Sequence, residues 1–171
     1  MNRYVALLRG VSPSNANMGA LRSSFEAAGL SDVRTVLASG NVIFSAPPTD
    51  EADLVQRCES AMQDGIGRSF ATIIRPRDEL RDMITADPFI NQDMPVGAKA
   101  VVTFLPRPPA QLPSLPISRD GVTIFAANQR AVYTYYVVSS AGPVFMNLLE
   151  HTFGKTVTTR TWQTVRRCAN A

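Results

Sequence analysis

The order of strand-like and helix-like segments between Tyr4 and Ile74 constrains the fold of this chain more than any other feature. Apolar runs typical of strands alternate with apolar stripes at helical spacing. Strands are predicted at 4–8, 33–38, 41–46 and 70–74, and helices at 18–28 and 50–64. The order β-α-β-β-α-β is the split pattern of a ferredoxin-like sheet. The first half of the chain is therefore expected to form such a sheet, with a further helix at 77–86.

The second half repeats this plan less completely. It predicts strands at 98–105, 122–127, 131–138 and 155–160, and helices at 144–153 and from Trp162 onward. Five prolines within 106–116 exclude a regular helix there. Each half closes with a strand followed by a helix, so internal duplication is the economical explanation. We predict an α+β fold of two ferredoxin-like (βαββαβ) halves, residues 1–90 and 98–171, packed as one unit.

The segment Thr35–Phe44 predicts a hairpin, because Ser39-Gly40-Asn41 separates two apolar runs. A two-residue loop places odd positions of the first strand opposite even positions of the second. One face, which we expect to form the core under the two helices, carries Val33, Thr35, Leu37, Val42 and Phe44. The other carries Arg34, Val36, Ala38, Ile43 and Ser45. The second face stays apolar at two positions, so we expect the second half of the chain to cover part of it.

Composition and motifs exclude several function classes. No run of 18 apolar residues exists, so a membrane span is not expected. The two cysteines, Cys58 and Cys168, fall on apolar helix faces, which favours buried free thiols in a cytoplasmic protein over a disulfide. No phosphate-binding glycine loop, dinucleotide fingerprint or nucleophile elbow occurs. With one histidine, His151, and two distant cysteines, neither a metal site nor a cofactor is predicted, and nothing identifies an enzyme.

Charge is distributed unevenly along the chain. Residues 1–97 hold nine basic and twelve acidic residues, whereas residues 98–171 hold eight basic and two acidic ones. The basic half either attracts a phosphate-bearing partner or simply coats a solvated surface. Tyr133, Tyr135 and Tyr136 in this half either offer stacking surface for nucleic acid or only favour a strand. The aromatic signature of RNA-recognition domains is absent from the central strands.

The most site-like residues are polar groups where elements join. They form three segments: Arg9 and Gly10, then Ser39, Gly40 and Asn41, and finally Thr159, Arg160 and Trp162. Backbone N–H groups at helix starts beside an arginine hold anions. The competing interpretation is structural, with the Ser and Thr residues capping and the glycines turning.

These segments also carry a family resemblance. YVALLRGV, MGALRSSFEAAGLSDVRTVLASGNVIF and TTRTWQTV resemble the bacterial family catalogued as domain of unknown function 1697. The resemblance spans nearly the whole chain and implies an α+β fold of two ferredoxin-like halves. It implies no activity, because the function of the family is not established.

The chain departs from the family pattern in three places. Residues 11–17 read VSPSNAN where the family has a loop close to INVGGKN. Thr161 and Gln163 stand where the closing motif RNWNTV has asparagines, and SSAGPVFM at 139–146 replaces a basic Ser-Lys segment. Any binding that relatives achieve with those lysines and asparagines is in question here.

Three functional hypotheses follow. The first is a non-catalytic module that binds an anionic partner, phosphate-bearing or nucleic acid, through Arg9, Arg160 and the basic residues of 98–171. The second is a small-molecule enzyme or binder whose pocket lies between the halves, lined by Arg160, Trp162 and Asn41. The third is a protein–protein interaction role. The sequence does not indicate an oligomeric state.

Overall fold

The computed structural model describes residues 1–138 and 143–171, and these divide into two compact units. The first unit comprises Met1–Thr85 and Arg166–Ala171, and the second comprises Ala86–Val165. Residues 139–142, part of a segment that departs from the family pattern, lie outside the described residues. Each unit has its own sheet, its own helices and its own hydrophobic cluster. That the two halves pack as one unit stays a prediction.

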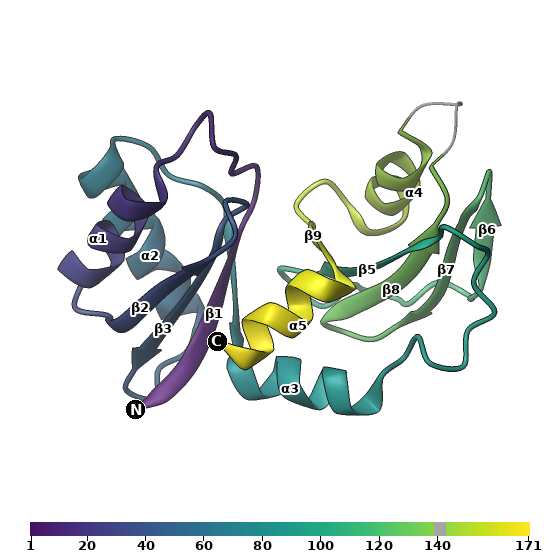
Figure 1. Ribbon diagram of the computed structural model, residues 1–171, viewed down its shortest axis with the longest axis horizontal. Coiled ribbons are helices and arrows are strands. Elements are labelled where there is room, and N and C mark those ends of the chain that lie inside the picture. Colours follow the sequence, from purple (N-terminus) through teal and green to yellow (C-terminus); the bar gives the residue numbers. More distant parts are fainter. Residues whose placement is uncertain (139–142) are drawn as a thin grey trace. The chain divides into compact units, whose positions relative to one another are not determined.

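The first unit contains a four-stranded antiparallel sheet with the strand order β2-β3-β1-β4 (Figure 1). Its elements are β1 (Asn2–Leu8), α1 (Met18–Ala27), β2 (Ser31–Val36), β3 (Asn41–Ala46), α2 (Glu51–Ile66), β4 (Thr72–Pro76) and α3 (Arg77–Ala86). Their type and order were predicted correctly, with boundaries that shift by two residues or fewer. Asn17 caps α1, because its side chain accepts a hydrogen bond from the N–H of Ala20.

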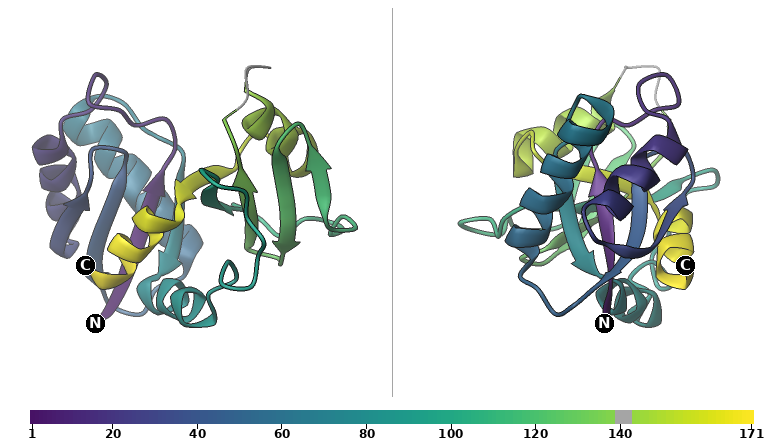
Figure 2. Two further views of the ribbon diagram at one scale, coloured as in Figure 1. Left: turned by 45° about the vertical axis from the view of Figure 1, so that its right-hand side comes forward. Right: turned by 90° about the vertical axis from the view of Figure 1, so that its left-hand side faces the viewer.

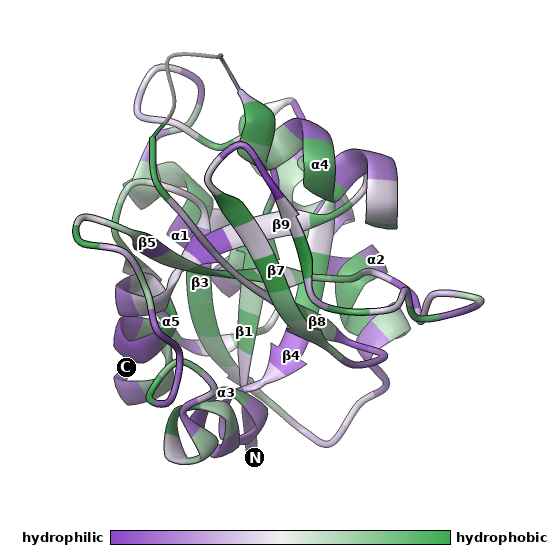
Figure 3. Ribbon diagram, turned by 90° about the vertical axis from the view of Figure 1, so that its right-hand side faces the viewer, coloured by the Kyte–Doolittle hydropathy of each residue, from purple (hydrophilic) through white to green (hydrophobic). Residues whose placement is uncertain are grey.

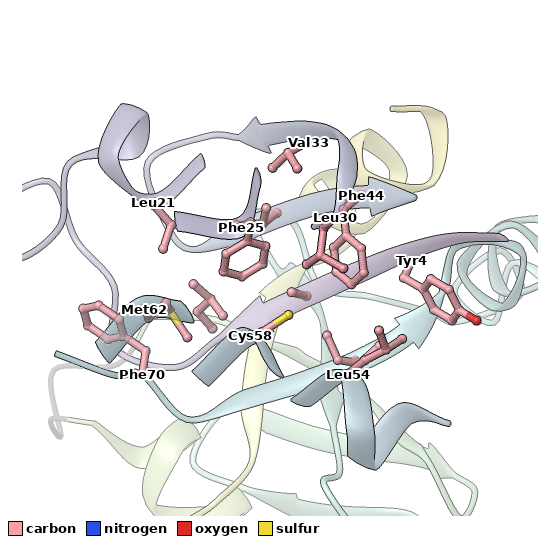
Figure 4. Close-up of a cluster of buried hydrophobic side chains, with 14 of the residues drawn as sticks. Tyr4, Leu21, Phe25, Leu30, Val33, Phe44, Leu54, Cys58, Met62 and Phe70 are labelled. Carbon is pink, nitrogen blue, oxygen red and sulfur yellow. The ribbon is translucent and has the colours of Figure 1, made fainter. Parts of the chain in front are cut away.

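Helices α1 and α2 lie side by side over one face of this sheet (Figure 2). Beneath them, apolar residues of both helices and of the strands form a buried cluster (Figure 4). Phe44 lies inside it, with ring centroids 5.8 Å from Tyr4 and 6.0 Å from Phe25. This is the core that the odd and even positions of the hairpin predicted.

The hairpin loop differs from its prediction. The parity is confirmed, since Thr35 pairs with Val42 and Arg34 with Ile43. The loop, however, has four residues, 37–40, and not two. Leu37, expected in the core, has a φ of +60° and is 44% exposed. It leaves the core because the strand ends one residue before it.

The other face of this sheet is also buried. Val5, Leu7 and Ile43 have exposures of 0%, 1% and 0%. The last six residues of the chain, Arg166–Ala171, belong to the same compact unit, and Cys168 and Ala169 are buried there. Their backbone oxygens accept hydrogen bonds from α3 at Ala169 and Ala171. The second half of the chain thus contributes its final turn to this unit, in line with the expected cover.

The second unit contains a five-stranded antiparallel sheet with the order β6-β7-β8-β5-β9. Its elements are β5 (Lys99–Phe104), β6 (Ile117–Arg119), β7 (Val122–Ala127), β8 (Ala131–Tyr136), α4 (Val144–Phe153) and β9 (Thr158–Thr161), and α5 (Trp162–Asn170) leads back to the first unit. No helix occupies 106–116; an extended loop and the short edge strand β6 replace it, as the prolines predicted.

Helix α4 covers one face of this second sheet. Its colouring in Figure 3 is amphipathic, with hydrophobic and hydrophilic residues alternating around the helix. The hydrophobic side, with Leu148 and Leu149, packs on Val122, Ile124 and Val132. At the edge of this contact Tyr136 stacks on Phe145, with ring centroids 4.3 Å apart and an interplanar angle of 10°.

The described residues therefore form a mixed α and β protein with two antiparallel sheets and five helices. None of these helices is long and apolar enough to cross a membrane.

Candidate functional site

The predicted site residues fall into two groups, one in each unit. Arg9, Gly10 and Ser39–Asn41 lie in the first unit, and Thr159, Arg160 and Trp162 lie in the second. In the first group, the N–H of Leu8 donates to the carbonyl of Gly40 at 2.8 Å, and the N–H of Arg9 donates to Ala71 at 2.9 Å. The end of β1 and the hairpin loop therefore meet at one end of the first sheet.

Asn41 and Gly40 are structural in this group. Asn41 is fully buried, and its amide nitrogen donates to the carbonyl of Val36 at 2.9 Å and to Ser39 Oγ at 3.1 Å. The amide thus closes the four-residue loop. Gly40 has a φ of +84°, and a Cβ there would lie 2.9 Å from Val11 Cβ. Loop closure explains the conspicuous Ser-Gly-Asn of the sequence.

In the second unit, Thr159 and Arg160 point to opposite faces of the sheet. Thr159 pairs with Thr103, whereas Arg160 pairs with Val102. Val102 also pairs with Tyr133 across β8, and directly paired residues share a face. Arg160 therefore lies on the same face as Tyr133, and its guanidinium donates to the carbonyl of Thr159 at 2.8 Å.

That face, opposite α4, carries three half-buried aromatic rings, Phe125, Tyr133 and Tyr135, which we call the aromatic face. The ring centroid of Phe125 lies 6.4 Å from that of Tyr133 and 5.8 Å from that of Tyr135, with interplanar angles of 34° and 32°. Tyr136, grouped with the other tyrosines in the sequence analysis, lies on the opposite face. Two of the three tyrosines thus form part of the aromatic face.

Phe125 lies at a β-bulge beside these tyrosines. The register of β7 against β8 shifts between Ile124, which pairs with Thr134, and Ala126, which pairs with Tyr133. Phe125 is the extra residue of this bulge. It lies on the aromatic face by alternation with Thr123, which pairs with Tyr135, while Ile124 stays in the core under α4.

Phe89 and Trp162 bury one end of the aromatic face. Phe89, from the segment after α3, is 5% exposed and lies edge-on to Phe125 and Tyr133, with centroids 5.3 and 6.1 Å away. Trp162 is 9% exposed and lies 5.2 Å from Phe89. The predicted site residue Trp162 is therefore a support for the aromatic face and is itself mostly covered. Thr161 caps the following helix, because its hydroxyl accepts a hydrogen bond from the N–H of Thr164.

The charge of this sheet is entirely basic. Its five strands contain Lys99, Arg119 and Arg160 and no acidic residue. The second unit as a whole holds six basic and four acidic residues. This balance is weaker than that of residues 98–171, because Arg166 and Arg167 belong to the first unit. The positive character is thus located on the strands of the sheet.

The chemistry expected of a nucleophile or a metal site is missing from the described residues. Residues 1–138 and 143–171 contain no group of three His, Cys, Asp or Glu side chains placed to hold a metal ion. Both cysteines are free and buried, as predicted. Burial raises the pKa of the Cys58 thiol to about 12, so it stays protonated and poorly nucleophilic near neutral pH.

Sequence reasoning missed Phe89 and Phe125. Alternation within β7 was a signal for Phe125. Val122 and Ile124 face the core, so the alternate residues, Phe125 among them, face away from it. No local signal marks Phe89, because it reaches the sheet from a segment outside any regular element.

Comparison with known families adds one decisive observation. The model of the family described as "Protein of unknown function (DUF1697)" matches residues 1–133. The chain belongs to the DUF1697 family. This confirms the resemblance seen in the sequence, and the match covers the whole first sheet and the strands β5 to β7 and ends within β8.

A solved structure also resembles this DUF1697 chain. "The structure of conserved bacterial protein SP0830 from Streptococcus pneumoniae" matches with a TM-score of 0.72 and 18% sequence identity, covering 99% of this chain and 97% of the other. At this identity the similarity shows the fold alone. No curated protein matches the chain.

Proposed function

We propose that this DUF1697 protein is a non-catalytic module that binds a phosphate-bearing partner through the second unit. The proposal rests on two features of one sheet. One of its faces is the half-buried aromatic face, and its strands contain basic residues but no acidic ones. Phosphate oxygens are attracted to such a surface, and arginine pairs with them by two parallel hydrogen bonds. Arg160, on the aromatic face, is the residue we assign to this contact.

The test is binding to labelled oligonucleotides and to heparin, measured by fluorescence anisotropy over a range of salt concentrations. Phosphate contacts release counterions, so log affinity should fall linearly with log salt concentration. Binding that is undetectable to every polyanion at low salt would contradict the proposal.

Two variants test whether Arg160 makes a phosphate contact. Arg160→Gln should weaken binding and reduce the magnitude of the salt slope by about 1, because one phosphate contact is lost. Arg22→Gln is the matched control, because Arg22 lies on α1 in the other unit and pairs with Glu26 at 2.8 Å. Equal losses in the two variants would mean that Arg160 acts only through total charge.

A small-molecule ligand is the second candidate, on the strength of one groove in the second unit. Ala98–Ala100 and Thr161–Gln163 line a hollow of about 420 Å³ that includes Lys99 and the indole of Trp162. Thermal-shift screening of metabolites, with Lys99→Gln as the variant, tests this candidate. A stabilising metabolite whose effect survives that substitution would place the ligand elsewhere.

We also propose that the two halves, residues 1–90 and 98–171, are ferredoxin-like and arose by internal duplication. Two strand orders support this: β2-β3-β1-β4 in the first sheet and β7-β8-β5-β9 in the second, where β6 is an added edge strand. In each half these four strands follow one another in the same relative order. A bacterial, cytoplasmic protein is the setting we propose, supported by the bacterial origin of the similar structure and by two free buried thiols.

A further inference from the structure

We infer that the partner is single-stranded nucleic acid, whose bases stack on the aromatic face formed by Phe125, Tyr133 and Tyr135. This inference rests on the proposed function, since it specifies which phosphate-bearing partner the second unit takes. Its starting point is that these three rings are only half buried and lie outside the hydrophobic cluster under α4.

The hydrophobic cluster under α4 does not include the three rings. That cluster is built from the opposite face of the sheet, with Ile124 and Val132 fully buried. On the aromatic face Phe89 packs edge-on against Phe125 and Tyr133, yet all three rings keep accessible surface. Aromatic rings on a sheet face are the surface on which nucleobases stack, because every base has a flat π-face.

Ring spacing favours a single strand over a duplex. The centroid of Phe125 is 5.8 Å from that of Tyr135 and 6.4 Å from that of Tyr133. Successive bases in duplex DNA are about 3.4 Å apart and cover one another's faces. Two neighbouring duplex bases therefore cannot each lie on a separate ring, whereas the splayed bases of a single strand can.

The positive charge of the sheet favours nucleic acid over uncharged ligands of an aromatic surface. Arg160 lies on the same face as Tyr133, through their common neighbour Val102, so a backbone phosphate can bind it while a base lies on the tyrosine. The strands of the sheet contribute no carboxylate that would repel the backbone. An arginine beside stacking rings is the combination found in sequence-tolerant single-strand binding.

The experiment compares two ligands of equal charge. One is an oligothymidylate of about twelve nucleotides, and the other is an abasic strand with the same number of phosphates. The wild-type chain should bind the oligothymidylate more tightly than the abasic strand, and more tightly than a duplex with the same number of phosphates. Equal affinity for the oligothymidylate and the abasic strand would overturn base stacking while leaving phosphate binding intact.

Variants of Tyr135 locate the stacking. Tyr135→Leu keeps an apolar side chain but removes the π-face, and should weaken oligothymidylate binding by about 5- to 150-fold. Tyr135→Phe keeps the ring and should bind like the wild type, and neither change should affect the abasic strand. Tyr136→Leu, the neighbouring tyrosine on the opposite face, is the control that should leave binding unchanged.

The two proposals fail in different ways. If no polyanion binds the wild-type chain, the proposed function fails and this inference fails with it. If the abasic strand and heparin bind but Tyr135→Leu retains its affinity for oligothymidylate, stacking on the aromatic face is wrong and the phosphate-binding function stands. Phe125→Leu repeats the test at a second ring, so that a folding defect in one variant does not decide the result.

Discussion

At the scale of single residues, Gly40 is the position where backbone and packing most clearly demand glycine. Its φ is +84°, and a Cβ would lie 2.9 Å from Val11 Cβ and 3.0 Å from Leu8 Cβ. Gly10 has a similar φ of +77°, but a Cβ there would meet nothing within 4 Å. Comparing the two glycines therefore distinguishes the cost of backbone strain, which both positions share, from the cost of steric overlap, which only Gly40 has.

Gly40→Ala should lower the free energy of unfolding by about 2–5 kcal/mol, because left-handed strain and overpacking add. Gly10→Ala should cost only the backbone part, about 1–2 kcal/mol. Urea denaturation of both variants measures the difference. Equal losses would show that the region around Val11 relaxes to accept the methyl group.

Thr134 offers the opposite outcome, a stabilising substitution. Within residues 1–138 and 143–171, its buried hydroxyl finds no hydrogen-bond partner. Thr134→Val removes a desolvated polar group and should raise the free energy of unfolding by about 1 kcal/mol. Thr72→Val is the control: the Thr72 hydroxyl donates to the carbonyl of Phe70 at 2.9 Å, so its loss should cost about 1 kcal/mol. A loss at both positions in urea denaturation would contradict this prediction.

Cys58 makes stability depend on pH in the alkaline range. Burial raises its pKa from 9.0 to about 12, so the folded chain holds a proton that the unfolded chain releases above pH 9. The stabilisation is complete below pH 9 and is lost as the pH rises toward 12, by about 1.4 kcal/mol per pH unit. Unfolding of the wild type and of Cys58→Ala, compared from pH 8 upward, measures this contribution. A slope that is identical in the two proteins would rule it out.

At the scale of elements, α1 and α2 approach closely at one glycine. A Cβ on Gly65 in α2 would overlap Ser24 Oγ and lie 2.8 Å from Ser24 Cβ in α1. Ser24 is buried, and its hydroxyl donates to the carbonyl of Ala20. The small side chains of Ser24 and Gly65 therefore set the distance between the two helices that cover the first sheet.

Gly65→Ala should destabilise the first unit by about 1–3 kcal/mol, although alanine favours a helix over glycine by about 1 kcal/mol. Adding Ser24→Gly should recover part of this loss, because it removes both overlapping atoms. The double-mutant cycle in urea gives the coupling energy. A stabilising Gly65→Ala would mean that helix propensity outweighs the overlap.

At the scale of the whole chain, the last six residues complete the first unit rather than the second. Arg81 donates to the carbonyl of Ala169 at 3.1 Å, and Arg77 donates to that of Ala171 at 3.2 Å. Cys168 is fully buried, whereas its neighbour Arg167 is exposed. The fold of the first unit therefore depends on residues that are distant in the sequence.

Cys168→Arg places a charge in this buried position and should lower the stability of the first unit by about 3–5 kcal/mol. Hydrogen exchange should then accelerate in peptides covering β1 and β3. Arg167→Ala is the matched control and should change stability by less than about 0.5 kcal/mol. Unchanged protection of β1 in the Cys168 variant would show that the final turn is dispensable.

The sequence alone was sufficient for the type and order of the elements in the first unit. Hydrophobic periodicity and capping residues are local, and they place α1, β3 and α3 where the structure has them. The parity of the hairpin was equally local, since the predicted two-residue loop and the observed four-residue loop both leave Thr35 and Val42 on one side. The family was recognisable from short segments, and two of the three lie within the matched residues 1–133.

Only the tertiary structure decided where the candidate site lies. Arg160 shares a face with Tyr133 because both pair with Val102 on an intervening strand, and Phe89 reaches the rings from a segment without regular structure. Alternation puts Phe125 on the face away from Val122 and Ile124, but only the pairing of β7 with β8 brings its ring beside the tyrosines. Local patterns fix which way a side chain points within its own strand. Which side chains meet depends on strand order, register and long-range packing, and these are properties of the folded chain.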